Sequence, residues 1–192
     1  MLILVIMLSL VVLNSQKNTS VQSQEGEPEQ KIAREDPGST AQPFVANESS
    51  QHVKLDFSQK YIDASNENEY VNVDIILNTE SAKTNGAYIE IVYDPESLSN
   101  VDVFPAFDTQ SLYGQQSDVT TLSHSPQEGK FVLGVSTSTE QEGTGRIATL
   151  SFKPLRPSSK SSTQVFFSTL SEGYSDSEKF PADSGSLEIK LK

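Results

Sequence analysis

The stretch NGAYIEIVYDPESL, residues 85–98, decides the fold class because its side chains alternate in character. In an extended strand successive side chains point to opposite faces, so one face here carries Ala87, Ile89, Ile91 and Tyr93. The opposite face carries Tyr88, Glu90 and Val92. Asp94-Pro95 then ends the strand, because proline cannot donate to a sheet ladder and aspartate favours turns. The stretch therefore predicts a β-strand with one buried face.

The same alternation recurs along the C-terminal two thirds of the chain, in short segments bounded by Gly, Pro, Asn or Ser. They are residues 53–57, 70–78, 130–136, 148–152, 163–168 and 186–192. No segment shows a helical period over three turns, which favours an all-β protein over a βαβ fold. Only Val103–Glu128 lacks clean alternation, and we expect irregular strands and an exposed loop there. The pattern predicts an antiparallel jelly-roll β-sandwich of about nine strands.

Inward positions of these strands form the predicted hydrophobic core. Its members are Val71, Val73, Ile75, Leu77, Ile89, Ile91, Tyr93, Leu133, Val135, Leu150, Phe152, Leu187 and Ile189.

The N-terminal part of the chain has a different composition. Residues 1–13, MLILVIMLSLVVL, are apolar but too few for a spanning helix of roughly 20 residues, and they are typical of an export signal or a short membrane anchor. Residues 14–51 are rich in Gln, Ser, Glu and Pro, which predicts a disordered acidic linker. We therefore expect residues 52–192 to form the folded domain, outside the cytoplasm, either secreted or held at the membrane only through the N-terminal segment.

Charge and composition exclude several functions. The net charge of −12 disfavours nucleic acid and anionic lipid as ligands. The chain has no Cys and two His, His52 and His124, which are expected to be solvated loop residues, so neither a nucleophile triad nor a transition-metal site is predicted. The pairs Asp94/Glu96 and Asp176/Glu178 have a spacing that could ligate calcium, but chance surface carboxylates are the preferred interpretation. We predict no enzyme activity, no catalytic residue, no metal and no cofactor.

Two motifs, in this order and spacing, carry a family resemblance. Tyr93-Asp94-Pro95-Glu96-Ser97-Leu98 follows one strand, and Arg146-Ile-Ala-Thr-Leu-Ser-Phe-Lys153 forms another behind a Gly143–Gly145 turn. Across roughly residues 55–191 the chain resembles the cohesin domain family. The resemblance implies a nine-stranded jelly-roll that binds dockerin modules through a flat sheet face, in assemblies that degrade polysaccharides outside the cell. Dockerin-binding members often carry Asn and Asp where this chain has Gly86 and Tyr88.

The predicted partner site is the outward face of the 85–93 strand, with Tyr88, Glu90 and Val92. Two alternatives remain open beside a protein partner, either dockerin-like or another surface protein. One is a carbohydrate-binding module for a polysaccharide. Since the chain has no Trp, the stacking residues would be Tyr88, Tyr113, Phe166 and Tyr174. The other is a structural cell-envelope protein without a discrete ligand.

Overall fold

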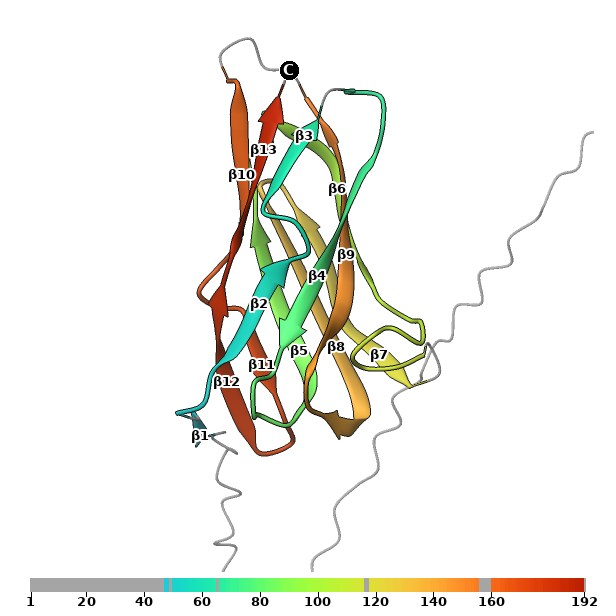
Figure 1. Ribbon diagram of the computed structural model, residues 1–192, viewed down its shortest axis with the longest axis vertical. Coiled ribbons are helices and arrows are strands. Elements are labelled where there is room, and N and C mark those ends of the chain that lie inside the picture. The colour runs from blue at the N-terminus through green and yellow to red at the C-terminus, as the bar shows by residue number, and fades with distance from the viewer. Residues whose placement is uncertain (1–46, 49, 65, 116–117, 156–159, 192) are drawn as a thin grey trace, which may run out of the picture. The chain divides into compact units, whose positions relative to one another are not determined.

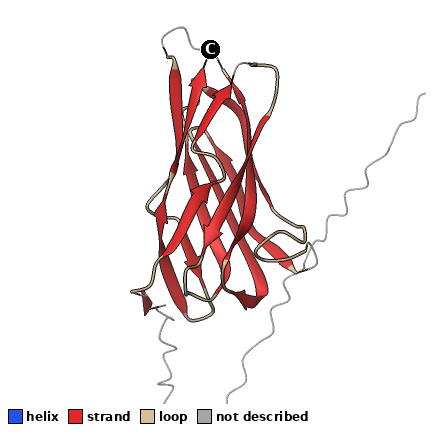
Figure 2. Ribbon diagram, in the orientation of Figure 1, coloured by secondary structure: helices blue, strands red, loops and turns tan. Residues whose placement is uncertain are grey.

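The computed structural model describes residues 47–48, 50–64, 66–115, 118–155 and 160–191, and these are strands and connecting loops without a helix (Figures 1 and 2). The strands are β1 Asn47–Glu48, β2 Val53–Phe57, β3 Tyr61–Ala64, β4 Val71–Asn78, β5 Thr84–Val92, β6 Leu98–Pro105, β7 Val119–Gln127, β8 Lys130–Gln141, β9 Thr144–Pro154, β10 Ser162–Phe167, β11 Glu172–Tyr174, β12 Glu178–Ser184 and β13 Ser186–Leu191. The predicted N-terminal segment 1–13 lies outside the described residues, as does nearly all of the linker 14–51. None of the described residues belongs to a helix long and apolar enough to span a bilayer.

The strands form two layers. In one layer β5 lies between β8 and the pair β10 and β11, with β7 beyond β8 and β13 and β3 beyond β10. The other layer has the order β2-β4-β9-β6. Strand β12 pairs with β11 in its first half and with β2 in its second half, so it joins the layers along one side (Figure 1). The sandwich prediction is confirmed, with more strands than the nine expected.

The pairing is mixed rather than purely antiparallel. Strands β1 and β12, β12 and β2, and β13 and β3 pair in parallel. The first long strand is interrupted after Phe57, so that β2 belongs to one layer and β3 to the other. One chain segment therefore pairs with both layers. Fewer strand edges with unpaired backbone groups remain along this side of the sandwich.

The core lies between the two layers and agrees with the sequence pattern. Of the thirteen predicted core residues, all are buried except Val71 and Tyr93, which are half-buried and pack against the same cluster. Phe57 of β2 and Phe167 of β10 stack across the layers with ring centroids 4.5 Å apart. The alternation in β5, β8 and β9 therefore assigned each side chain to the correct face, and the outward side chains of these strands are the ones available for function.

Candidate binding face

The outward surface of the layer that contains β5 and β8 is the first candidate site, and we call it the β5–β8 face. The antiparallel register sets its rows: Gly86 lies opposite Ser136, Tyr88 opposite Gly134, Glu90 opposite Val132 and Val92 opposite Lys130. Cross-strand neighbours of this kind have Cβ atoms about 5 Å apart, so they form one continuous surface. Strand β11 extends it beyond Gly86 and Tyr88, and β10 extends it beyond Val92.

All three predicted partner residues lie on the β5–β8 face. Tyr88 and Val92 are half-buried, whereas Glu90 is 7% exposed and its carboxylate forms an ion pair with Lys130 at 3.1 Å. The backbone of Glu90 is held as well, because its N–H donates to Ser171 Oγ and its carbonyl accepts from the same hydroxyl. Glu90 therefore stabilises the centre of the face as a paired charge, while Tyr88 and Val92 supply its accessible apolar surface.

Tyr174 of β11 is a member of this face that the sequence named only as a possible sugar-stacking residue. Its ring lies directly over Gly86, at a position where any Cβ would collide with the ring. Its hydroxyl donates to the carbonyl of Val135 in β8 at 2.7 Å, so the side chain spans β5 completely. Burial raises the pKa of Tyr174 to about 12.

The rim of the face is polar with one large apolar side chain. Lys179 Nζ lies 2.7 Å from Glu172 Oε1 on the β11–β12 side. On the β10 side Phe166, which pairs with Val92, is 45% exposed. The face thus combines aromatic and aliphatic side chains with one ion pair at its centre and another at its rim.

Two sequence-based expectations about single residues were wrong. Tyr113 is 2% exposed and shares a hydrogen bond with Thr84, and burial raises its pKa. It cannot stack on an external sugar, so the four aromatic residues proposed for that role do not form one platform. His124 is exposed as expected, but it lies in strand β7 rather than in a loop. Its Nε2 is 2.9 Å from Asp102 Oδ1 and its ring packs edge-on against Phe131.

Three of the four carboxylates in the predicted calcium-type pairs contact protein groups. Asp94 and Glu96 both contact Lys160 Nζ, at 2.6 and 3.1 Å, and the hydrogen bond from Lys160 is the main cause of the lowered pKa of Asp94. Asp176 accepts a hydrogen bond from the amide of Asn85. Within the part of the chain that the structure describes, no three acidic or histidine side chains gather as a metal site would need.

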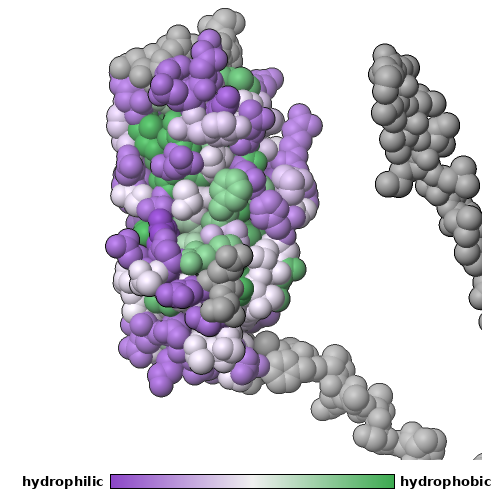
Figure 3. All heavy atoms as spheres, turned by 90° about the vertical axis from the view of Figure 1, so that its right-hand side faces the viewer, coloured by the Kyte–Doolittle hydropathy of each residue, from purple (hydrophilic) through white to green (hydrophobic). Residues whose placement is uncertain are grey.

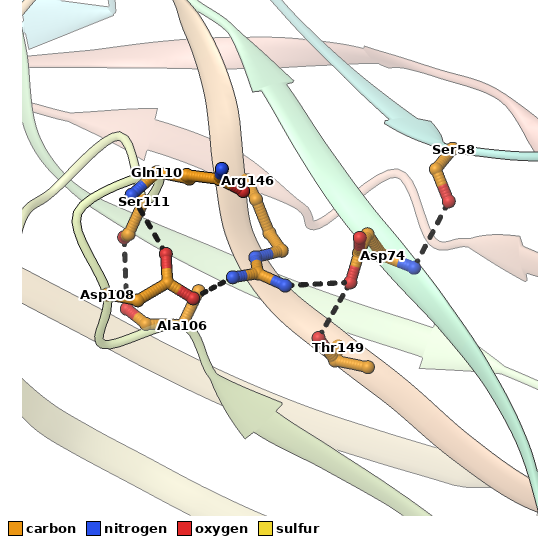
Figure 4. Close-up of polar contacts among 8 residues, drawn as sticks. All are labelled: Ser58, Asp74, Ala106, Asp108, Gln110, Ser111, Arg146 and Thr149. Carbon is orange, nitrogen blue, oxygen red and sulfur yellow. Dashed lines mark hydrogen bonds and ion pairs between the residues drawn. The ribbon is translucent and has the colours of Figure 1, made fainter.

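On the other layer Arg146 anchors the long connection between β6 and β7. Its guanidinium contacts Asp108 in that connection and Asp74 of β4, where Nη1 is 3.4 Å from Oδ1 (Figure 4). The pKa of Asp108 is lowered, first by the backbone N–H of Gln110 and then by Arg146. Thr149 completes the network by donating to Asp74 at 2.9 Å. The two terminal nitrogens of Arg146 are paired in this way, whereas its buried Nε has no hydrogen-bond partner among the described residues. The ion pairs give the cluster a structural role.

Similar proteins are found by structure and not by sequence. No protein-family model and no curated protein match the chain. The cohesin module of a family 33 glycoside hydrolase from Clostridium perfringens ATCC13124 is 11% identical and superposes with a TM-score of 0.58, over 74% of this chain and 98% of that one. A non-cellulosomal cohesin from the archaeon Archaeoglobus fulgidus is 16% identical, with a TM-score of 0.53, over 74% and 93%.

A third similar structure contains a bound partner. It is the third ScaC cohesin from Acetivibrio cellulolyticus, solved in complex with the ScaB dockerin, and it is 16% identical with a TM-score of 0.51, over 72% of this chain and 98% of that one. Identities this low establish shared architecture and leave ligands to be argued from the residues present. The described domain has the cohesin fold.

Proposed function

We propose that this protein is a non-catalytic binding module that docks a protein partner on its β5–β8 face. The observation that carries the proposal is the composition of that face. Tyr88, Val92 and Tyr174 supply its accessible aromatic and aliphatic surface, the Glu90–Lys130 pair lies among them, and the Lys179–Glu172 pair lies at the rim. Specific protein interfaces have an apolar, aromatic centre and a polar rim. The ScaC cohesin of the same fold, solved with a dockerin bound, supports a dockerin-like module as the class of partner.

The contact chemistry would differ from that implied by the family resemblance. Gly86 offers no side chain and is covered by Tyr174, and Tyr88 offers an aromatic ring with a hydroxyl. Burial of the two tyrosines would supply most of the affinity, because aromatic side chains dominate interface hot spots. The Glu90–Lys130 pair would exclude partners that place an unpaired charge at the centre, since desolvating such a charge is costly.

The absence of enzymatic activity belongs to the same proposal. Its support is that the histidines and carboxylates considered above contact structural partners: His124 binds Asp102, and Asp94 binds Lys160. A general acid and base would instead face a shared cleft within reach of a substrate.

The cellular setting is also part of the proposal. The apolar segment 1–13 would export or anchor the protein, and the acidic residues 14–51 would act as a tether that lets the domain reach a partner. A role in attaching polysaccharide-degrading proteins outside the cell follows if the partner is a dockerin. A structural envelope role without a discrete ligand is the outcome if no partner binds.

The proposal is tested by measuring binding of purified, calcium-loaded dockerin modules, including the ScaB dockerin of Acetivibrio cellulolyticus, to the immobilised full chain. We expect at least one dockerin to bind. We expect Tyr88→Ala to weaken that binding by about 2 kcal/mol, in the range of aromatic hot spots. We expect Val92→Lys to abolish it, because it removes an apolar contact and places a second positive charge directly opposite Lys130.

Asn72→Ala is the matched control, because Asn72 is an outward residue of β4 on the opposite layer. It should bind like the wild type. The proposal fails if no dockerin binds the wild type, or if Tyr88→Ala and Val92→Lys bind as well as Asn72→Ala. Circular dichroism on all variants separates loss of binding from loss of fold.

A further inference from the structure

A groove of about 570 Å³ lies on the opposite layer from the β5–β8 face, where β4, β9 and β6 meet the edge of β7. Its volume falls within the range of small-molecule sites. Figure 3 views the domain from the side on which β6 and β9 lie in Figure 1, and hydrophobic surface interrupts hydrophilic surface there. We call this feature the β6 groove.

Two aromatic side chains line the β6 groove and remain exposed. Tyr70 is 55% exposed and Phe104 is 51% exposed. Only four aromatic side chains are strongly exposed among the described residues, and two of them are these. Lys153 Nζ lies 4.6 Å from the centroid of the Tyr70 ring, and this cation–π contact holds the ring in position. Leaving two large rings in water at one groove has an energetic cost that bound apolar surface would remove.

Hydrogen-bonding groups line the same groove in one row across the sheet. Asn72 of β4 and Asp102 of β6 both pair with Ser151 of β9, so their side chains point outward together. Asp102 Oδ1 accepts from the backbone N–H of Val103 and lies 2.9 Å from His124 Nε2. Within the described residues no hydrogen bond takes up Asp102 Oδ2 or the amide of Asn72. These groups are positioned but have unused donor and acceptor capacity.

The backbone of β6 is distorted at this position. The register between β6 and β9 shifts between Ser99 and Asp102, and Asn100 adopts a left-handed conformation with φ 49°. Bulges of this kind re-aim side chains and occur next to functional sites. Asn100, within this distorted stretch, lies in the lining of the groove. The β6 groove is therefore built by a specific departure from regular pairing.

From these features we infer that the β6 groove binds a neutral carbohydrate. A sugar ring presents an apolar C–H face, which aromatic rings can cover, and hydroxyl groups at its edge, which amides and carboxylates can bind in pairs. Asn72, Asn100 and Asp102 supply those polar groups beside the rings of Tyr70 and Phe104. An anionic glycan is disfavoured, because the chain carries a net charge of −12. This site is separate from the β5–β8 face, so it does not depend on the proposed protein partner.

The test is isothermal titration calorimetry of the full chain with three neutral probes: cellohexaose, xylohexaose and mannohexaose. The chain is kept in a detergent without a sugar headgroup, because alkyl glycosides would compete for the site. We expect at least one probe to bind, and Phe104→Ala to weaken that binding about tenfold or more through loss of the ring contact. Asn72→Ala should also weaken it, through loss of paired hydrogen bonds.

Phe166→Ala is the matched control, because Phe166 is an exposed aromatic residue of similar accessibility on the β5–β8 face. It should leave sugar binding unchanged. The inference is overturned if none of the probes binds at millimolar concentration, or if Phe104→Ala binds as tightly as Phe166→Ala. A proline-rich peptide is titrated separately as an alternative ligand. The inference is also overturned if this peptide binds the groove and the sugars do not.

Discussion

Tyr174 lies across the backbone of Gly86 so closely that residue 86 has no space for a side chain, although the two residues are 88 positions apart in the chain. The ring bridges β11 to β8 through the bond from its hydroxyl to the Val135 carbonyl, 2.7 Å long. Glycine at 86 is thus explained by packing, since its backbone conformation does not require it.

We predict that Gly86→Ala destabilises the domain by about 1–3 kcal/mol, because overpacking displaces the Tyr174 ring. Tyr174→Ala should also destabilise it, but the two substitutions combined should cost less than the sum of the separate effects. Chemical denaturation of all four proteins gives the coupling energy. Strict additivity of the two substitutions would contradict the packing explanation.

The buried phenol of Tyr174 predicts a stability change at alkaline pH. Its pKa of about 12 in the folded state lies above the value near 10 expected for an unfolded chain. Between these values the unfolded state loses the proton and the folded state keeps it, so stability present below pH 10 is lost as pH rises toward 12. As the pH rises from about 10 to about 12, the melting temperature of Tyr174→Phe should fall less than that of the wild type. An equal slope in both proteins would rule out this contribution.

We expect the loss of Lys130 to destabilise the domain more than the loss of Lys179, although each lysine pairs with one glutamate. Lys130→Met leaves the buried side chain of Glu90 without its partner, and we expect a loss of stability on the order of 3 kcal/mol. Adding Glu90→Gln should restore most of it, because the buried charge is then gone. Lys179→Met is the control: its partner Glu172 is 26% exposed, so the cost should stay within about 1 kcal/mol. Urea titrations that gave equal losses for both lysine variants would refute the prediction.

We expect the ion pairs of Arg146 to restrain the connection between β6 and β7. Its two terminal nitrogens contact Asp74 and Asp108, and a lysine has no planar fork that could hold both carboxylates. We expect Arg146→Lys to accelerate amide hydrogen exchange at Ser111 and Leu112, whose N–H groups are bonded near this anchor. Thr149→Val removes only the neighbouring bond to Asp74 and should leave exchange there unchanged. Unaltered protection in Arg146→Lys would show that the ion pairs do not restrain the connection.

Some parts of the fold could not be predicted because their sequences lack alternation. Strand β7 has only exposed and half-buried side chains, so nothing in Val119–Gln127 distinguishes it from a loop. Strand β11 has three residues, too few for a pattern, yet it supplies Tyr174 to the candidate face. Both strands are held by backbone pairing to longer neighbours, β8 and β5. Their existence depends on non-local contacts rather than on local side-chain order.

The inward and outward faces of the long strands can be assigned from the sequence, because the two-residue period of an extended backbone leaves no other assignment. The sequence therefore identified the sandwich, most of its core and the outward positions of Tyr88, Glu90 and Val92. Which outward residues meet depends on strand order and register, and these follow from non-local pairing. They placed Tyr174 over Gly86 and Lys130 beside Glu90, and they brought Phe104 and Tyr70 into the lining of one groove, because they join residues that are distant in sequence.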